Sequence, residues 1–180
     1  RKQKRLFTNY PLELYKDCPY YVPPLYSEEK NILNPKKNFN LANCDVRCFL
    51  AYKEGKLVGR VAAVVHNQYN RMWNKKDIRF SRFDAVDDLE VFDALLKTVE
   101  RCGRERGLER IHGPWGFNDT DREGMLTYGF SERSTYSTNY YYPYFAENMR
   151  KLGYADESKW VERGFTIPER PYERILRIAS

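Results

Sequence analysis

The sequence predicts an α/β (α+β) domain in which a mixed, mostly antiparallel central sheet carries helices on both faces. Two apolar runs joined by a short glycine-containing turn, residues 47–66, predict a β-hairpin. A strand, an amphipathic helix and a second strand follow between residues 77 and 112, and this order predicts a βαβ crossover. Helical patterns before and after these segments supply the helices that pack on the sheet.

The first 45 residues are expected to form a basic tail and short helices that belong to the same domain. Residues 1–5 hold four cations and are expected to be a solvated tail. Residues 11–16 and 25–33 favour two short helices, separated by the proline-rich connector 19–24.

The core of the domain is expected to span residues 46–167 and to begin with the hairpin. Its strands are residues 47–52 and 57–66, which are rich in strand-forming residues. Gly59 interrupts the second strand, which indicates a bulge or a close approach of another backbone or side chain. Residues 67–74 form a polar link with room for a helical turn.

The strand and helix that follow are defined by their periodicity. Residues 77–83 alternate, and the predicted faces are Ile78, Phe80 and Arg82 against Arg79, Ser81 and Phe83. The helix is expected to start at Asp88, and its apolar residues, spaced by three and four, are Leu89, Phe92, Leu95, Leu96 and Val99. Asp84 or Asp87 is expected to cap it.

The remainder of the chain is less regular. Residues 108–112 predict a short strand, and a long loop over residues 117–136 suggests a functional role or an irregular insert. Pro143 and Gly153 bracket the next helix, as expected for a helix start and stop.

The last part of the chain predicts two further strands and a helix. Strand material is expected at residues 159–161 and 164–167. Pro168 then precedes a final helix, so residues 168–180 are expected to begin a C-terminal helix that is truncated here.

Composition and charge restrict the classes of function. A chain of 180 residues with 42% hydrophobic and 31% charged residues is typical of a soluble globular domain, and we expect a cytoplasmic protein. No apolar run reaches the roughly 20 residues of a membrane span, so no membrane contact is expected. Residues 1–60 hold 12 Lys and Arg against 6 Asp and Glu, whereas residues 61–180 hold 19 of each. Because the excess is local, nucleic acid is not a favoured partner and remains a remote alternative.

The cysteines give little indication of a metal site. Cys18, Cys44, Cys48 and Cys102 have no paired CxxC spacing. A zinc site with His66 and His112 is the weaker reading, and we expect no metal. Free thiols in a reducing compartment are the favoured interpretation.

In order along the chain, these segments resemble the GCN5-related N-acetyltransferase (GNAT) superfamily. The matching pieces cover about residues 46–166 and read FLAYKEGKLVGRVAAVV, DIRFSRFDAVDDLEVFDALLKTVERCGRERG, LERIHGP and PYFAENMRKLGY. The segments GRVAA, HGPWGF and YYYPYF most resemble a subgroup of long, poorly characterised bacterial acetyltransferase-like proteins. In that subgroup a similar unit forms the N-terminal half of a longer chain.

The resemblance implies that acetyl-CoA or another acyl-CoA is a co-substrate, bound where the strands 77–83 and 108–112 splay apart. Its pantetheine is expected to pair with the backbone near Ser81, Arg82 and Phe83. Its pyrophosphate is expected on the N–H groups at the next helix start, at Val86, Asp87, Asp88 and Leu89. This turn has no glycine and no basic residue, and its carboxylates would repel a phosphate by roughly 1–4 kcal/mol at contact. The alternative is that these acids only cap the helix.

The resemblance also implies catalytic residues. The tyrosine that the family often has four residues before the helix-ending glycine is Met149 here. Tyr141 or Tyr144 is expected to replace it as the general acid for the leaving thiolate, with aromatic packing as the alternative role. His112 ends its strand toward the expected cleft and is the third catalytic candidate. Its alternative role is a hydrogen-bonded residue at the strand edge.

The expected function is transfer of an acetyl or acyl group from acyl-CoA to an unidentified amine, by direct attack within a ternary complex. The acceptor is a small-molecule or peptide amine, and we expect contact with a missing C-terminal half or a second copy. The alternative is a catalytically silent GNAT-like module with a structural or ligand-binding role in a longer protein.

Overall fold

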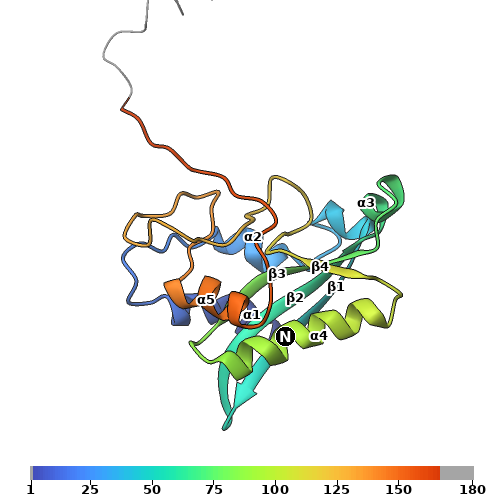
Figure 1. The fold of residues 1–180 in the computed structure, drawn as a ribbon, viewed down its shortest axis with the longest axis horizontal. Helices are drawn as coiled ribbons and strands as arrows, with labels where there is room; N and C mark the ends of the chain where they lie inside the picture. Colours follow the sequence, from blue (N-terminus) through green and yellow to red (C-terminus); the bar gives the residue numbers. More distant parts are fainter. Residues whose placement is uncertain (1, 167–180) are drawn as a thin grey trace, which may run out of the picture.

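A computed structural model describes residues 2–166 of the chain. Its elements are, in order, α1 (Lys2–Leu14), α2 (Tyr26–Asn31), the 3₁₀ helix η1 (Phe39–Ala42), β1 (Cys44–Lys53), β2 (Lys56–His66), α3 (Asn67–Met72), β3 (Asp77–Ala85), α4 (Leu89–Arg104), β4 (Arg110–His112) and α5 (Pro143–Lys151). The sheet has the order β1-β2-β3-β4, in which β3 and β4 are parallel and the other pairs are antiparallel. The predicted class, a mixed and mostly antiparallel sheet with helices on both faces, is confirmed (Figure 1).

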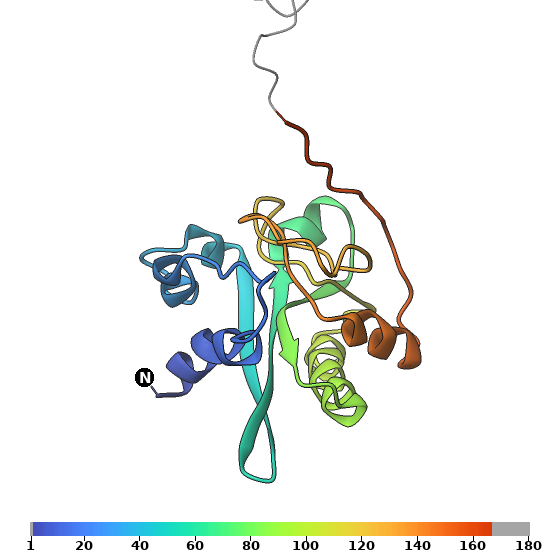
Figure 2. The same ribbon diagram turned by 90° about the vertical axis from the view of Figure 1, so that its left-hand side faces the viewer.

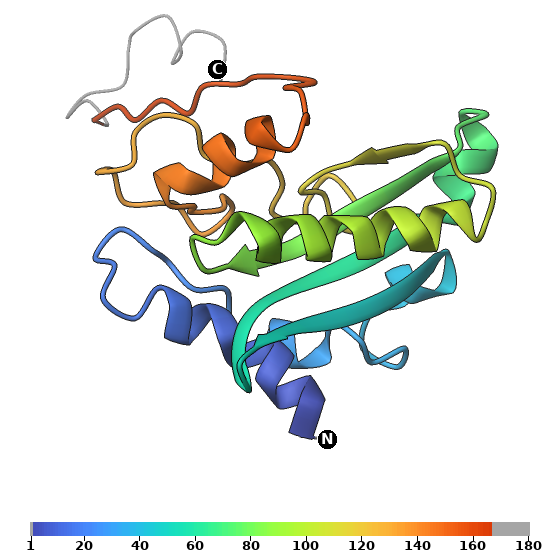
Figure 3. The ribbon, with the colours of Figure 1, turned by 60° about the horizontal axis from the view of Figure 1, so that its bottom comes forward.

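The sheet separates two hydrophobic cores, because successive side chains of a strand point to opposite faces. Val61 and Ala63 of β2 belong to the larger core, which includes the apolar stripe of α4. Val64 belongs to the smaller core together with Phe7 of α1. Figure 2 shows α1 on one side of the sheet and α4 and α5 on the other. Figure 3 shows that α5 lies beside the N-terminal half of α4.

The hairpin forms as predicted, and its turn has the backbone that a two-residue connection needs. Glu54 and Gly55 have φ values of 51° and 76°, which are typical of a type I′ turn. An added Cβ at Gly59 would lie 2.8 Å from Leu95 Cδ1 of α4. The β1–β2 register also shifts opposite Gly59, between Ala51 and Tyr52. Both predicted reasons for glycine, a close approach and a bulge, are therefore present.

The N-terminal basic run is helical, which corrects the predicted solvated tail and the predicted helix start at residue 11. α1 spans Lys2–Leu14, and Lys2 and Arg5 are exposed on it. Phe7 and Tyr10 of the same helix are 3% and 6% exposed. Burial of these two aromatic side chains against the sheet holds the helix in place, and its charged residues face the solvent.

The strand β3 does not alternate regularly, so the predicted faces of Arg82 and Phe83 are wrong. Arg82 has a φ of 48°, and the β2–β3 register shifts between Arg60 and Ala62, opposite this point. One extra residue in β3 forms a bulge. The bulge returns Phe83 to the face of Phe80, and both rings are buried in the core beneath α4.

Four of the five residues of the predicted apolar stripe are buried on α4, but Leu89 is 41% exposed and the cap is a different acid. Asp88 is the N-cap, and its side chain accepts a hydrogen bond from the Glu90 N–H at 3.0 Å. Asp84, one of the two predicted caps, lies inside β3, and Asp87 precedes the cap. Because Asp88 caps the helix, the side chain of Asp84 is available for another role.

The segment after α5 is extended but pairs with no strand in the described part of the chain. The predicted strand material at residues 159–161 and 164–166 is therefore wrong. Trp160 and Phe165 are 59% and 87% exposed. Strand-forming residues give no strand without a partner edge to pack on. Residue 167 and the predicted helix after Pro168 lie outside the described residues.

The four cysteines are free thiols, as the sequence predicts. Cys44 and Cys102 are buried, and Cys18 and Cys48 are half-buried. Between residues 2 and 166, no three His, Cys, Asp or Glu side chains are grouped so that they could hold a metal ion. No helix in this range is long and apolar enough to cross a membrane.

Gly113→Ala is expected to destabilise the fold where β3 and β4 separate. Gly113 has a φ of 149°, and an added Cβ would overlap the backbone oxygen of Phe80. We expect the free energy of unfolding to fall by about 2–4 kcal/mol, because neither backbone can move aside. Gly164→Ala is the control, since its added methyl group meets nothing within 4 Å. Urea unfolding measures both variants, and equal losses would contradict this account.

Candidate functional site

The parallel strands β3 and β4 separate after three residue pairs and leave an open edge. The pairing ends at Arg79 and His112, and the Trp115 N–H then donates to the Phe80 oxygen at 2.9 Å. The following stretch of β3, residues 81–85, has no partner in β4. An unpaired strand edge can pair with another extended group, so residues 81–85 are where such a group would bind.

The three residues predicted to bind pantetheine belong to this stretch of β3, and their side chains point to both faces of the sheet. Ser81 is 4% exposed and Phe83 is fully buried. The guanidinium of Arg82 turns away from the strand to Glu29, with Nη2 at 3.0 Å from Oε1. Other parts of the chain cover this stretch, and the Ala85 oxygen accepts a hydrogen bond from the Tyr144 hydroxyl at 2.9 Å, so binding of pantetheine here stays a prediction.

The predicted phosphate turn has few free N–H groups. The Val86 N–H donates to the Val58 oxygen at 3.0 Å, and the Asp88 N–H donates to the Val86 oxygen at 2.8 Å. Asp87 and Leu89 remain exposed at the helix start, and Asp87 Oδ1 accepts from Asn148 Nδ2 at 3.0 Å. Binding of a pyrophosphate by this turn stays a prediction, and the backbone N–H groups of Asp87 and Leu89 would have to supply the hydrogen bonds.

The acids at this turn are not free charges. Lys53 Nζ lies 2.6 Å from Asp88 Oδ2 and 2.8 Å from Glu90 Oε2. The hydrogen bond from Lys53 is the main cause of the lowered pKa of Asp88. One lysine from the hairpin therefore offsets part of the repulsion that the sequence alone indicates.

The two predicted tyrosines come from the segment that leads into α5 and lie near the end of β3. Tyr144 donates its hydroxyl to the Ala85 oxygen at 2.9 Å. Tyr141 is 3% exposed, and its ring centroid is 4.7 Å from that of Phe145. Burial, followed by the negative charge of Asp84, raises the pKa of Tyr141, and burial is also the main cause of the raised pKa of Tyr144. Both hydroxyls therefore stay protonated at neutral pH and act as donors.

The structure does not group His112 with these tyrosines. Its Nε2 is 3.8 Å from Asp77 Oδ2, and its Nδ1 is 3.6 Å from Glu157 Oε2. Its ring packs edge-on against Trp115, with centroids 5.2 Å apart. Nε2 is buried and has no hydrogen-bond partner between residues 2 and 166. Burial lowers the pKa of His112 although Asp77 acts against that shift, so the ring is neutral at pH 7.

A cavity of about 170 Å³ lies next to the open edge of β3, on the face that carries α1 and α2. Ser81, Arg82 and Asp84 of β3 line it, and Tyr141 borders it. Its other charged lining residues are Glu28, Glu29, Arg60, Asp121 and Arg122. The cavity places four carboxylates and three guanidinium groups beside the strand edge, so it suits a polar or cationic ligand.

Two ion pairs fix the charged side chains of this cavity. Arg60 Nε lies 2.7 Å from Asp84 Oδ2, and the two side chains are 5% and 9% exposed. Arg60 Nη1 also donates to the Phe7 oxygen at 2.6 Å. The second pair joins Arg82 to Glu29. Although burial alone would raise the pKa of Glu29, Arg82 and Arg60 lower it, so its carboxylate is charged.

The place of Asp84 beside the cavity was not predicted from the sequence, because its position before a helix is typical of a helix cap. A signal was present, since Arg60 is the charged residue inside the otherwise apolar strand of residues 57–66. A buried arginine requires a carboxylate partner. That partner could have been sought among acids flanked by buried residues, as Asp84 is by Phe83 and Ala85.

Two known proteins are similar in sequence to most of this chain. No family model matches. Protein YghO of Escherichia coli (strain K12) is 30% identical over 150 residues, which are 83% of this chain and 38% of that protein. The bacterial ceramide synthase of Caulobacter vibrioides (strain NA1000 / CB15N) is 28% identical over 177 residues, which are 95% of this chain and 46% of that protein. The chain therefore spans less than half the length of both relatives.

Among solved structures, the chain is similar to a protein described as a probable acetyltransferase. The likeness covers 93% of this chain and 91% of that one, with a TM-score of 0.45 and 12% sequence identity.

Arg60→Met is expected to lower the free energy of unfolding by about 3–5 kcal/mol, because it leaves Asp84 buried and unpaired. The double variant Arg60→Met, Asp84→Leu is expected to recover most of this loss. Lys76→Met is the control, because it breaks an exposed pair with Glu109 at 2.6 Å and should cost less than about 1 kcal/mol. Chemical denaturation measures all three, and a double variant as unstable as Arg60→Met would refute the argument.

His112 is expected to make the fold sensitive to acid. Its pKa in the folded chain is lowered, so its neutral form stabilises the fold above the unfolded-state pKa of about 6.5. This contribution is lost as the pH falls below that value, because the unfolded chain takes up the proton first. The stability difference between wild type and His112→Gln should therefore shrink from pH 7.5 to pH 5.5. Urea titrations at both values test this, and parallel pH profiles would speak against it.

Proposed function

We propose that this chain carries the acyl-transfer site of an N-acyltransferase, which moves an acyl group from acyl-CoA to an amine. The observation that carries the proposal is the stretch of β3 at residues 81–85, which has no partner in β4 and has a cavity with carboxylates and Tyr141 beside it. The edge would take the acyl donor, and the cavity would take the acceptor.

The acyl donor fits the open edge because pantetheine is an extended chain with two amide groups. Such a chain can form strand-like hydrogen bonds with residues 81–85. Because the pyrophosphate lies at the opposite end of pantetheine, the thioester would then lie at the Ser81 end of this stretch, beside the cavity that Tyr141 borders. The remaining N–H groups at Asp87 and Leu89 would face the pyrophosphate at the start of α4.

The acceptor fits the cavity because a primary amine is cationic at neutral pH. Glu28 and Asp121 line the cavity and form no ion pair with any residue from 2 to 166, so their carboxylates remain to attract the amine. In the reaction the deprotonated amine nitrogen attacks the thioester carbonyl carbon, and the carbon–sulfur bond breaks. Asp84 is the candidate that takes the amine proton, and Tyr141, which borders the same cavity, is the candidate that protonates the leaving thiolate.

The acyl group is proposed to include long chains. One relative is named a bacterial ceramide synthase, and a ceramide is the amide of a fatty acid with an amino alcohol. Formation of that amide from an acyl-CoA is the reaction class proposed here. The acceptor amine of this chain is proposed to be a small molecule or a peptide.

A second candidate is a ligand-binding module without catalysis. The specific observation in its favour is the turn before α4, where the N–H groups of Val86 and Asp88 are already bonded within the chain. Lys53 is likewise occupied by Asp88 and Glu90. In that case a ligand would bind in the cavity and no acyl group would be transferred.

The test uses acetyl-CoA and a long-chain acyl-CoA with a panel of primary amines, and it measures thiol release together with the amide product by mass spectrometry. Tyr141→Phe is expected to lower turnover by about 10²-fold or more, because the thiolate loses its proton donor. Tyr154→Phe is the control, since it also removes one tyrosine hydroxyl, which donates to Glu100 Oε1 at 2.8 Å. Acyl-CoA binding without any amide product would support the second candidate.

A further inference from the structure

A second pocket, of about 410 Å³, lies at the opposite end of the sheet. The open edge is near Ala85, which pairs with Gly59 of β2, whereas this pocket is bordered by Val65 at the far end of the same strand. Its other lining residues come from η1, α3 and the turn after α4, and they are Ala42, Asn43, Asn67, Asn70, Arg71, Lys75, Arg106 and Leu108. The volume is within the range of small-ligand sites.

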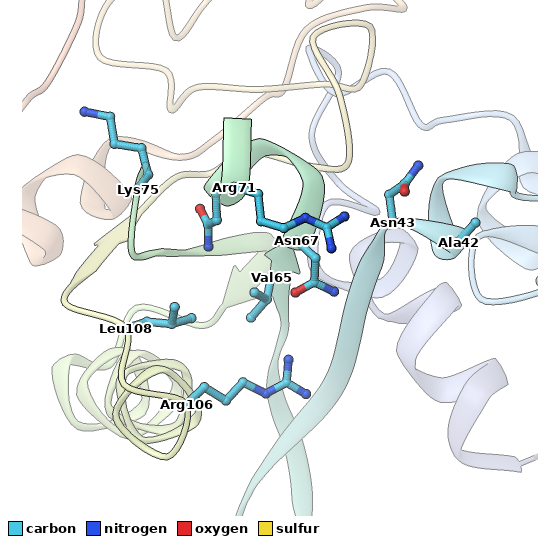
Figure 4. Close-up of a pocket in the computed structure, with 9 residues that line it drawn as sticks. Ala42, Asn43, Val65, Asn67, Arg71, Lys75, Arg106 and Leu108 are labelled. Atoms are coloured by element: carbon cyan, nitrogen blue, oxygen red, sulfur yellow. The ribbon is translucent and has the colours of Figure 1, made fainter. Parts of the chain in front are cut away.

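The lining of this second pocket is basic. It contains Arg71, Lys75 and Arg106 and no aspartate or glutamate. Arg106 Nη1 is paired with Asp45 Oδ2 at 2.7 Å. Arg71 and Lys75 form no ion pair with any residue from 2 to 166, so two positive charges there are not neutralised. Figure 4 shows the Arg71 and Arg106 side chains extending toward the same gap, with Lys75 at the rim and directed away from it.

Amide groups complete the polar lining. Asn67 Nδ2 donates to Asp45 Oδ2 at 3.2 Å, and Figure 4 shows its side chain between those of Arg71 and Arg106. Asn70 Nδ2 donates to the Asp77 oxygen at 2.9 Å. The Oδ1 atom of Asn70 is buried and accepts no hydrogen bond from the described part of the chain. A buried acceptor without a donor is costly unless a ligand or water supplies one.

We propose that this pocket binds the phosphate group of a phosphate ester. Guanidinium groups bind phosphate through charge-assisted and bidentate hydrogen bonds, and here two of them extend into one gap. A hydroxyl group next to the phosphate would donate to the Oδ1 atom of Asn70. The pocket shares no residue with the acyl-transfer cavity, so this inference is independent of the proposed function.

Two sources could supply such a phosphate, a soluble ester or the headgroup of a lipid. Met72 and Trp73 follow Arg71 in sequence and are 68% and 64% exposed. An exposed tryptophan next to basic residues is typical of residues that rest at a membrane surface. The phosphate chemistry is the same for both sources, and the experiment separates them.

The experiment measures binding of glycerol 3-phosphate by calorimetry at low salt, and co-sedimentation with vesicles of phosphatidylcholine alone or with phosphatidic acid. Wild type is expected to bind the soluble ester, or the vesicles that contain phosphatidic acid, and binding should weaken as salt is added. Arg71→Gln with Lys75→Gln should weaken that binding at least tenfold. Because neither residue has an ion pair in the described chain, the variant should keep the thermal unfolding midpoint of wild type.

The matched control is Lys56→Gln with Arg101→Gln, which also removes two exposed positive charges that form no ion pair with any residue from 2 to 166 but lies outside the pocket. It should bind as wild type does. Binding of the soluble ester would identify a small-molecule site, and binding only to the anionic vesicles would identify a headgroup site. No binding to either probe, or equal weakening in the control variant, would overturn the proposal.

Discussion

The bulge at Arg82 determines what the rest of β3 can do. Before the bulge, Phe80 faces the core beneath α4, and regular alternation would send Asp84 to that same core. The extra residue reverses this, so that Phe83 enters the core and Asp84 faces the cavity. Without it a carboxylate would be buried among apolar side chains, at a cost of several kcal/mol.

The ion pair of Arg60 with Asp84 is a consequence of that geometry. The two residues are register partners in β2 and β3, so their side chains meet on the face that carries α1. The Phe7 oxygen accepts another hydrogen bond from Arg60, which joins the N-terminal helix to the pair. Buried charges of this kind contribute little net stability. The pair lies at the wall of the cavity, where the proposed function gives its charges a role beyond folding.

The separation of β3 from β4 has a different cause, which lies in the loop after β4. Gly113 passes so close to Phe80 that only a residue without a Cβ fits. Arg79, fully buried, lies over the Trp115 ring at 3.5 Å and donates to the Gly116 oxygen at 3.0 Å. These contacts direct the loop across the sheet instead of along it. The edge of β3 beyond this point therefore has no strand partner in β4.

The sequence predicted those parts of the fold whose signals are local. The hairpin follows from a turn at Glu54 and Gly55, and α4 follows from its apolar stripe, so both were found from short stretches of sequence. The bulge at Arg82 has no local signal, because arginine is not a residue that favours a positive φ. The helical N-terminus depends on burial of Phe7 against a sheet whose first strand lies about 40 residues further along the chain. No local sequence pattern reveals this contact.

The candidate site was only partly predictable for the same reason. Tyr141 was found because it belongs to a cluster of aromatic residues before a helix, and that cluster is visible in the sequence. Asp84 was not found, because its role depends on Arg60 in a neighbouring strand and on one extra residue between Ser81 and Asp84. Asp84 precedes a helix in the sequence, but its pairing with Arg60 of the neighbouring strand makes it a buried carboxylate at the wall of a cavity. The cavity beside Asp84 therefore lies on the side of the sheet that carries α1, and Pro11 of that helix contributes to its lining.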